Sequence, residues 1–344
     1  MFGYKFLVTG GAGFIGSNLI DFLLSQGAAV VCLDNFATGK RENLNDASKN
    51  DRFTLYEGDI RNYEDCQKAV VGCDYVLHQA ALGSVPRSIE DPMASTDVNI
   101  GGFVKMLHAA KEAGVKRFVY AASSSTYGDH PDMPKVEHKF GNALSPYAIT
   151  KYVDELYARN FADLYGIECI GLRYFNVFGR RQDPNGAYAA VIPKFVSSLI
   201  NHESPYINGD GSYSRDFTYI DNVVQANIKA ATTPTKDIVC QMSLYANEQT
   251  IDFDASRPLS EVINIAYGER TTLNDLVVYL KEALSAYDSN ILNVPTVYRE
   301  TRNGDIPHSL ASIKKASALI GYHPEYSVRE GILEACGWYY KNLK

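Results

Sequence analysis

Apolar positions in the first 125 residues follow two alternating patterns. Short apolar runs rich in β-branched and aromatic residues predict buried strands at 4–8, 30–33, 53–60, 74–81 and 117–123. Between these runs, apolar residues three and four positions apart predict helices, most clearly at 17–24 and 103–114. Strands that alternate with helices are typical of an α/β fold in which helices cover both faces of a parallel sheet. We therefore predict a doubly wound parallel sheet of the Rossmann type.

The second half of the chain has a less regular pattern. We expect a strand just before Asn176, a strand at 262–266, and helices that begin at Ala190 and cover 271–287, 313–319 and 328–343. The stretch 232–259 has a mixed polar composition that fits neither pattern. We interpret it as a partly structured insertion at the surface.

Composition and charge exclude several classes of protein. The 344 residues are 46% hydrophobic and 21% charged, as in ordinary globular proteins. The formal net charge of −7 comes without a basic block, which argues against nucleic acid as a partner. No apolar run is long enough to span a membrane, and the first strand begins too early for a signal peptide. Six scattered cysteines without a C-x-x-C pair predict reduced thiols, so we expect a cytoplasmic protein without a metal site.

A glycine-rich turn connects the first predicted strand to the first helix. Its glycines can be aligned as G-x-G-x-x-G from Gly11 or as G-x-x-G-x-x-G from Gly10, and both alignments share Gly13 and Gly16. Such a turn brings backbone N–H groups and a helix N-terminus against a phosphate. The sequence therefore predicts a dinucleotide site at this turn.

An acidic residue follows the second predicted strand at the position that such a site uses. Asp34 lies 18 residues after Gly16, where a carboxylate can accept hydrogen bonds from an adenosine ribose. The same carboxylate repels the extra phosphate of NADP. This favours NAD as the cofactor, although the basic residues Lys40 and Arg41 follow closely.

A second group of residues carries acid–base chemistry. Three serines at 123–125 end the fifth predicted strand, and Pro146 marks the start of a later helix. On that helix, Tyr147 and Lys151 are four residues apart and share one face. A nearby ammonium and the positive charge of an oxidised nicotinamide favour the phenolate form of a tyrosine. Tyr147 is therefore a candidate general base, and a serine at the strand end can hold a substrate hydroxyl in line.

These motifs together resemble the extended short-chain dehydrogenases/reductases, and among them the sugar-nucleotide 4-epimerases. The resemblance covers nearly the whole chain, and it is carried by the segments 9–16, 34–36, 58–60, 78–81, 123–128, 147–151 and 172–179. The segments 79–88 and 179–188 are more similar to bacterial UDP-N-acetylhexosamine 4-epimerases than to plain UDP-galactose enzymes. The resemblance implies C4 epimerisation of UDP-N-acetylglucosamine through a 4-keto intermediate, with NAD retained and recycled. UDP-glucose and UDP-galactose are expected as further substrates.

The resemblance also implies catalytic roles. Tyr147 takes the proton from the sugar 4-hydroxyl, Lys151 holds the nicotinamide ribose, and Ser123 orients the substrate. Ser124 and Ser125 are close enough to assist, and the sequence does not separate the three serines. Ser124 and Ser125 also stand where dehydratases and decarboxylases of this family carry acidic residues, which weighs against those two reactions.

Binding residues are implied in the same way. Besides Tyr147 and Lys151, the residues implied for NAD are Gly10, Gly13, Phe14, Ile15, Gly16, Asp34, Asn35, Gly39, Asp59, Ile60, Gln79, Ala80, Ala81, Asn99 and Val177. Besides Ser123, Ser124 and Tyr147, those implied for the UDP-sugar are Gly83, Ser84, Asn176, Gln182, Ala190, Val191, Tyr206, Asn208, Arg215, Arg302, Asp305 and Ser309.

Three of the substrate-side expectations are specific. The segment 206–211 resembles the hairpin beside the uracil, and Arg215 and Arg302 are placed to clamp the diphosphate. Ser309 stands where the family walls the 2-substituent of the sugar, and a serine leaves room for an N-acetyl group.

The expected domain organisation follows from these assignments. An NAD-binding domain covers 1–178 and returns in part at 214–231 and 260–268, while 179–344 mainly binds the UDP-sugar, with the insertion at 232–259. The resemblance implies a homodimer through the helices around 103–113 and 147–165. Three alternatives stay open: a UDP-glucuronate-type 4-epimerase, an NAD-dependent keto-sugar-nucleotide reductase, and a non-catalytic nucleotide-binding regulator on the same fold.

Overall fold

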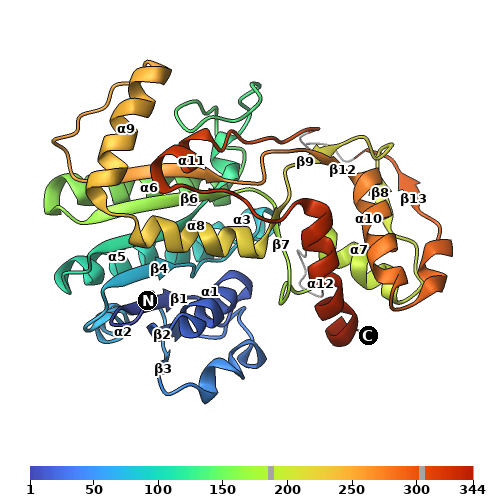
Figure 1. Ribbon diagram of the computed structural model, residues 1–344, viewed down its shortest axis with the longest axis horizontal. Coiled ribbons are helices and arrows are strands. Elements are labelled where there is room, and N and C mark those ends of the chain that lie inside the picture. The colour runs from blue at the N-terminus through green and yellow to red at the C-terminus, as the bar shows by residue number, and fades with distance from the viewer. Residues whose placement is uncertain (185–189, 302–306, 344) are drawn as a thin grey trace.

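The computed structural model describes residues 1–184, 190–301 and 307–343. At its centre lies a seven-stranded sheet in which every neighbouring pair of strands is parallel (Figure 1). The strand order is β11-β6-β5-β4-β1-β2-β3. The bounds are β1 (Lys5–Thr9), β2 (Ala29–Asp34), β3 (Phe53–Glu57), β4 (Tyr75–His78), β5 (Arg117–Ser123), β6 (Glu168–Tyr174) and β11 (Ser260–Ile265). The predicted Rossmann-type sheet is confirmed.

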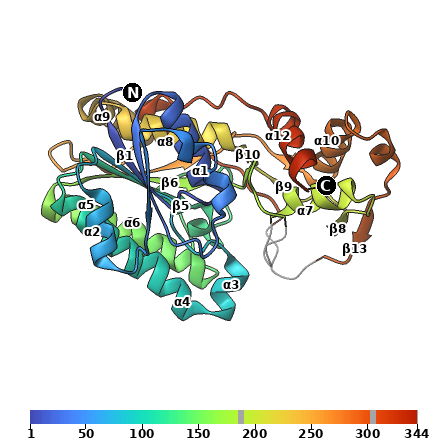
Figure 2. The same cartoon turned by 90° about the horizontal axis from the view of Figure 1, so that it is seen from below.

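Helices cover both faces of this sheet (Figure 2). One face carries α2 (Tyr63–Val70), α5 (Phe103–Glu112) and α6 (Pro146–Tyr165), and the other carries α1 (Phe14–Ser25) and α8 (Ile220–Thr232). Shorter helical segments in the connections are η1 (Arg41–Leu44), η2 (Ala47–Lys49), α3 (Val85–Glu90), α4 (Pro92–Thr96), the π-helix η3 (Asp97–Gly102) and η4 (Ser124–Tyr127).

The central strands are apolar because helices bury both of their faces. Phe6, Leu7 and Val8 of β1 have no accessible surface, and neither do Phe118 and Val119 of β5. Each such side chain stabilises the fold by about 1.5–3 kcal/mol relative to an exposed one. These runs are the ones from which the sequence predicts the strands.

Two strands are shorter than the apolar pattern predicts. The strand expected at 53–60 ends at Glu57, and the strand expected at 74–81 ends at His78. The residues that follow each strand leave the hydrogen-bonded ladder and line a cavity, which is described below. The two strands were predicted too long because Ile60, Ala80 and Ala81, which follow them, are also apolar.

The C-terminal part of the chain builds a smaller α/β unit beside the sheet (Figure 1). It contains α7 (Val191–Ile200), β8 (Tyr206–Asn208), α10 (Leu273–Ser285), η5 (Ser289–Asn293), β13 (Val297–Arg299) and α12 (Val328–Leu343). Since β8 pairs in parallel with β13, from much later in the chain, the predicted hairpin at 206–211 is wrong. Two short strand pairs connect this unit to the sheet: β7 (Val177–Phe178) with β10 (Thr218–Tyr219), and β9 (Ser214–Arg215) with β12 (Thr271–Thr272).

The segment 232–259 contains the helix α9 (Thr235–Gln249), which packs against α11 (Lys314–Ile320). Ile238, Met242 and Tyr245 on its inner face are buried. The segment is partly structured, as predicted, but one side of its helix belongs to the core.

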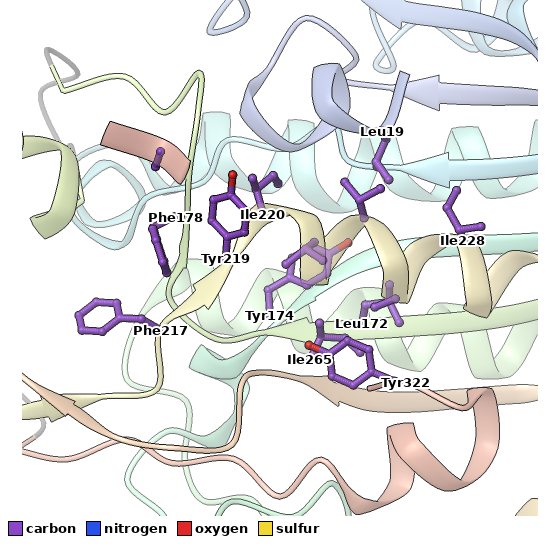
Figure 3. Packing of buried hydrophobic residues seen from close by; sticks show 14 of the residues in the cluster. Leu19, Leu172, Tyr174, Phe178, Phe217, Tyr219, Ile220, Ile228, Ile265 and Tyr322 are labelled. Carbon is purple, nitrogen blue, oxygen red and sulfur yellow. The ribbon is translucent and has the colours of Figure 1, made fainter. Parts of the chain in front are cut away.

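An aromatic cluster joins the smaller unit to the sheet where the chain leaves β6 (Figure 3). Phe178 packs against the rings of Phe217 and Tyr219, with ring centroids 6.5 and 5.6 Å apart. Beside this cluster, the Arg180 guanidinium donates to both carboxylate oxygens of Asp221 at 3.1 and 2.8 Å. These contacts fix the smaller unit against the start of α8.

Candidate active site

A cavity of about 600 Å³ lies at the carboxyl edge of the sheet, where β1, β2, β4 and β5 end. It brings together residues from strands that lie far apart in the sequence. The predicted site residues that line it are Gly10, Gly13, Phe14, Ile15, Gly16, Asp34, Asn35, Gly39, Asp59, Ile60, Gln79, Ala80, Ala81, Gly83, Ser123, Tyr147, Lys151, Val177 and Gln182. A second cavity, of about 570 Å³, lies behind α6 and contains none of the predicted site residues.

The glycine-rich turn is tight enough to require two of its glycines. Gly10 has a positive φ of 65°, and a Cβ there would lie 2.8 Å from the backbone of Ala80. A Cβ on Gly16 would lie 2.2 Å from the carbonyl oxygen of Gly10. The turn therefore leaves an uncovered backbone cradle at the start of α1, which suits a pyrophosphate.

The acid at the end of β2 is held by the same turn. One oxygen of Asp34 accepts a hydrogen bond from the backbone N–H of Ala12 at 2.9 Å, and the other accepts one from Phe36 at 2.8 Å. Burial raises the pKa of this carboxyl, against the effect of the two N–H groups. A carboxylate has about four acceptor sites, so two remain for ribose hydroxyls.

The two basic residues after Asp34 are paired with acids. Lys40 lies 2.8 Å from Asp183, and Arg41 lies 2.7 Å from Glu57. These ion pairs offset the positive charges of Lys40 and Arg41, which would otherwise attract the 2′-phosphate of NADP. The arrangement therefore supports the predicted preference for NAD.

A further acid follows β3 and has its own cation. Asp59 accepts from the Asn35 amide at 2.8 Å and from the Arg61 guanidinium at 2.7 Å. The hydrogen bonds from Arg61 lower the pKa of Asp59 to about 2. Asp59 is thus ionised at neutral pH, beside Asn35 at the same edge of the sheet.

The serines at the end of β5 are not equivalent. Ser123 lines the cavity, and its Oγ accepts from the Ser125 hydroxyl at 2.9 Å and from the Ser125 backbone N–H at 3.2 Å. Ser124 and Ser125 do not line the cavity. Ser125 therefore holds the Ser123 hydroxyl, and Ser123 is the one of these three serines that lines the cavity.

The helix α6 begins one residue before Tyr147, the predicted base. The Ser145 side chain caps the helix by accepting from Ala148, with Pro146 in the first turn. Tyr147 and Lys151 both line the cavity from this first part of the helix. The Tyr147 backbone N–H donates to Ser88 at 3.0 Å, which ties the helix start to α3.

Lys151 is almost fully buried, with 3% of its side chain exposed. Its ammonium lies 3.2 Å from Asp154, whose side chain is completely buried. His78 on β4 also faces this group, and burial lowers the pKa of His78 to about 3, so this imidazole stays neutral. The cavity thus contains a phenol and an ammonium on one helix face, with an ionisable carboxyl behind them.

Two predicted NAD residues support the cavity by contacts with neighbouring groups. Asn99, in the π-helix η3, accepts from the Leu82 N–H at 2.8 Å and donates to Thr150 at 3.1 Å, but it does not line the cavity. Gln79 lines the cavity, and its amide is held by Asn227 at 3.1 Å and by the Tyr174 hydroxyl at 3.2 Å. Asn99 therefore connects a wall of the cavity to α6.

The substrate-side predictions divide into two groups. Gly83 and Gln182 line the cavity, and Gln182 keeps a buried Oε1 without a partner among the described residues. Ser84 instead caps α3 by accepting from Arg87 at 3.2 Å. Asn176 turns the chain after β6 with a φ of +38°, and its amide donates to the Asp216 carbonyl at 3.0 Å.

The remaining substrate-side residues that the structure describes lie outside the lining of the cavity. Arg215 and Ser309 are neighbours there, since Arg215 donates to Pro307 at 3.1 Å and the Ser309 N–H donates to Ser214 at 3.1 Å. Arg302 and Asp305 fall outside the described residues. The other predicted residues of this group are Ala190 and Val191 at the start of α7, and Tyr206 and Asn208 on β8.

Sequence reasoning missed part of the cavity wall. Leu82, Ala94 and Val98 line it from the connection between β4 and α5, and Tyr174 lines it from the end of β6. Tyr174 lies within the segment 172–179, and its position at the end of an apolar strand could have identified it as a residue of the cavity wall. The other three carry no side-chain chemistry that a pattern can detect.

Among the described residues, no group of three or more metal-ligating side chains is close enough to hold a metal ion. In the same part of the chain, no helix is long and apolar enough to cross a membrane.

Comparison with known proteins assigns the family. The model of the "NAD dependent epimerase/dehydratase family" matches residues 6–240. The chain belongs to this family. The match covers the whole glycine-rich turn and the Tyr147–Lys151 pair, which both line the cavity.

Three relatives show the reactions found within the family. A putative UDP-glucose 4-epimerase of Methanocaldococcus jannaschii is 33% identical over 98% of both chains. The structure of a UDP-N-acetylglucosamine 4-epimerase of Methanobrevibacter ruminantium, in complex with UDP-N-acetylmuramic acid, is 37% identical over 99% of both chains, with a TM-score of 0.86. The structure of a UDP-glucuronic acid 4-epimerase of Bacillus cereus, with UDP-glucuronic acid and NAD, is 28% identical over 98% of this chain and 99% of that chain, with a TM-score of 0.82. The family and its NAD-bound structures confirm NAD as the cofactor.

Proposed function

We propose that the protein catalyses the NAD-dependent C4 epimerisation of UDP-N-acetylglucosamine to UDP-N-acetylgalactosamine, and also accepts UDP-glucose and UDP-galactose. The observation that carries the proposal is that the glycine-rich turn, Ser123, Tyr147 and Lys151 all line the same cavity. A bound dinucleotide and a reacting hydroxyl would share that space. The similarity to a UDP-N-acetylglucosamine 4-epimerase over the full chain supports the choice of sugar.

The cavity residues fit NAD. A Cβ at Gly10 or Gly16 would clash with backbone atoms, so the glycines keep the turn tight enough for a pyrophosphate, and Asp34 keeps two acceptor sites for the adenosine ribose. Lys151 would hold the nicotinamide ribose. When bound, NAD supplies the acceptor and later the donor of the hydride at C4 of the sugar. We assign residues 1–178, with the returns at 214–231 and 260–268, to the domain that binds it.

The chain's own residues move one proton. Tyr147, as phenolate, accepts the proton of the 4-hydroxyl, and Lys151 stabilises that charge from the same helix face. Ser123, oriented by Ser125, holds the reacting oxygen. The 4-keto sugar then turns in the cavity, and Tyr147 returns the proton to the oxygen after reduction from the other face.

The rest of residues 179–344, mainly the smaller unit, is proposed to bind the UDP-sugar. Gln182 is the best supported contact, because the residue lines the cavity and its buried Oε1 has no partner among the described residues. Arg215 and Ser309 lie next to each other, which supports the proposal that Arg215 binds the diphosphate while Ser309 walls the N-acetyl group. A serine at 309 leaves the room that an acetamido group needs.

Exposed apolar residues on α6 support the proposed homodimer. Ile149, Leu156 and Leu164 are each more than half exposed on this helix. These positions are seven and eight residues apart, so they lie along one side of the helix, and exposed apolar side chains gathered on one side are typical of a protein interface. We assign the contact to α5 and α6.

One specific observation favours a second candidate, a UDP-glucuronate 4-epimerase. The Bacillus cereus enzyme holds UDP-glucuronic acid on the same fold with NAD. The test is to incubate the purified protein separately with UDP-N-acetylglucosamine, UDP-glucose and UDP-glucuronic acid, without added NAD. Formation of UDP-N-acetylgalactosamine supports the proposal. Conversion of UDP-glucuronic acid alone supports the second candidate, and conversion of none of the three sugars supports the keto-sugar reductase or the non-catalytic regulator.

A further inference from the structure

Asp154 is a buried acid next to the proposed catalytic lysine. Its Oδ2 lies 3.2 Å from Lys151 Nζ, while its Oδ1 is buried without a hydrogen-bond partner among the described residues. The Asp154 side chain has no accessible surface. A buried carboxyl that is only partly satisfied destabilises a fold, and an apolar residue at this position would avoid that cost.

The helix places Asp154 in line with the proposed machinery. Positions 147, 151 and 154 are spaced i, i+4 and i+7, so they form one stripe along α6. Tyr147 and Lys151 line the cavity, and Asp154 lies behind Lys151 without reaching the lining. Asp154 therefore lies outside the wall of the cavity, and it can influence the reaction through Lys151 and through its own charge.

We propose that Asp154 is a positioning residue that holds the Lys151 ammonium in place and offsets part of its positive field at Tyr147. The inference rests on the proposed function, in which Tyr147 is the base. It goes beyond that function because it adds Asp154 to the two residues of this helix face that act in the reaction. The charge of Asp154 decides how strongly Lys151 favours the phenolate form of Tyr147.

The surroundings of Asp154 leave Lys151 as its dominant charged neighbour. Glu155, next along α6, is neutralised by Arg173 of β6, with N–O distances of 2.8 and 2.7 Å. Tyr120 of β5 faces the pair, and burial raises the pKa of Tyr120 well above its usual value, so it stays uncharged. His78 of β4 is neutral as well.

The charge of Asp154 changes near neutral pH. Burial raises the pKa of Asp154 to about 7, against the opposing effect of Lys151. Above this pH the carboxylate neutralises Lys151, and below it the ammonium acts on Tyr147 in full. Ionisation of Asp154 therefore opposes the loss of the proton from Tyr147, and the two titrations spread over a wide pH interval.

The substitution Asp154→Asn keeps the size of the side chain and removes its charge. Asp154 lies seven residues beyond Tyr147 on the helix, which corresponds to a separation of about 10 Å along the helix axis. A unit charge at about 10 Å and an effective dielectric constant of about 20 shifts a titration by about one pH unit. We expect the acidic limb of the activity profile to move down by about one unit and to become steeper. Asp154→Ser should do the same, which keeps the test available if one variant fails to fold.

The direct assay is the phenolate absorbance of the NAD-loaded protein, titrated as a difference from the same protein carrying Tyr147→Phe. The activity profile with a UDP-sugar is measured in parallel. Asp163→Asn is the matched control, because it removes the same charge from the same helix 16 residues beyond Tyr147. The expected result is that the midpoint of the phenolate titration lies about one pH unit lower in Asp154→Asn than in the wild type, while the midpoint in Asp163→Asn is unchanged.

Two outcomes would overturn the inference: an Asp154→Asn midpoint within about 0.2 units of the wild type, or an equal shift in Asp163→Asn. Failure of the proposed function is distinguishable from both. Absence of turnover with every UDP-sugar would contradict the function, while the phenolate titration would still report on Asp154.

Discussion

Replacing Gly16 by alanine tests whether the glycine-rich turn is built to hold a cofactor. A Cβ at this position would lie 2.2 Å from the Gly10 carbonyl oxygen and 2.7 Å from the Gly11 Cα. Real Cβ contacts are essentially never shorter than 3.0 Å, so the backbone of the turn must move by close to 1 Å. Both contacts are backbone atoms, and no flexible side chain can absorb the shift.

The expected cost follows from that displacement. Overpacking of a tight site costs about 1–3 kcal/mol. If the turn relaxes by opening, this free energy is taken from NAD binding, and 1–3 kcal/mol corresponds to roughly 5- to 150-fold in the dissociation constant. We expect Gly16→Ala to be purified with much less NAD than the wild type, and to melt at a lower temperature.

The assay measures NAD released by acid from the purified protein, together with the melting temperature with and without added NAD. Gly83→Ala is the matched control, because Gly83 lines the same cavity and a Cβ there meets nothing within 4 Å. Wild-type NAD content and melting temperature in Gly16→Ala would refute the reasoning. Equal losses in Gly83→Ala would show that any added methyl group disturbs the cavity.

Further substitutions test other parts of the site. Ser123→Ala should lower the turnover number by about 100-fold, as expected for a residue that orients a proton transfer, while Ser124→Ala, outside the cavity, should stay within about threefold in a coupled product assay. Arg173→Met leaves the buried Glu155 carboxylate unpaired and should cost about 3–5 kcal/mol of unfolding free energy in urea, and a loss below about 1 kcal/mol would contradict this. Ser309→Tyr should reduce turnover of UDP-N-acetylglucosamine at least tenfold more than that of UDP-glucose, and equal effects on both sugars would remove Ser309 from the proposed pocket.

Periodicity and motif spacing were sufficient for the sheet and for the centre of the site. The glycine-rich turn, Asp34 and the Tyr147–Lys151 pair depend on local order along the chain, and the parallel sheet brings them to one edge. Ser123 could not be separated from its neighbours by sequence, because only the turn into η4 shows which hydroxyl faces the cavity.

The contacts that depend on distant segments were beyond the sequence. The partner of β8 is β13, and a pattern of three residues carries no information about which strand it joins. Asp154 reads as an ordinary polar position on a helix, and its burial follows from the packing of α6 against the sheet. The same holds for α9, whose apolar face is visible only when α11 packs against it.

The central claim is that the hydrogen at C4 leaves and returns within one cavity, with resident NAD and with Tyr147 handling only the hydroxyl proton. The most direct test uses UDP-N-acetylglucosamine deuterated at C4, incubated with the purified protein in ordinary water without added NAD. The account predicts UDP-N-acetylgalactosamine that retains the deuterium at C4. Replacement of the deuterium by solvent hydrogen, or no conversion unless cofactor is added, would contradict it.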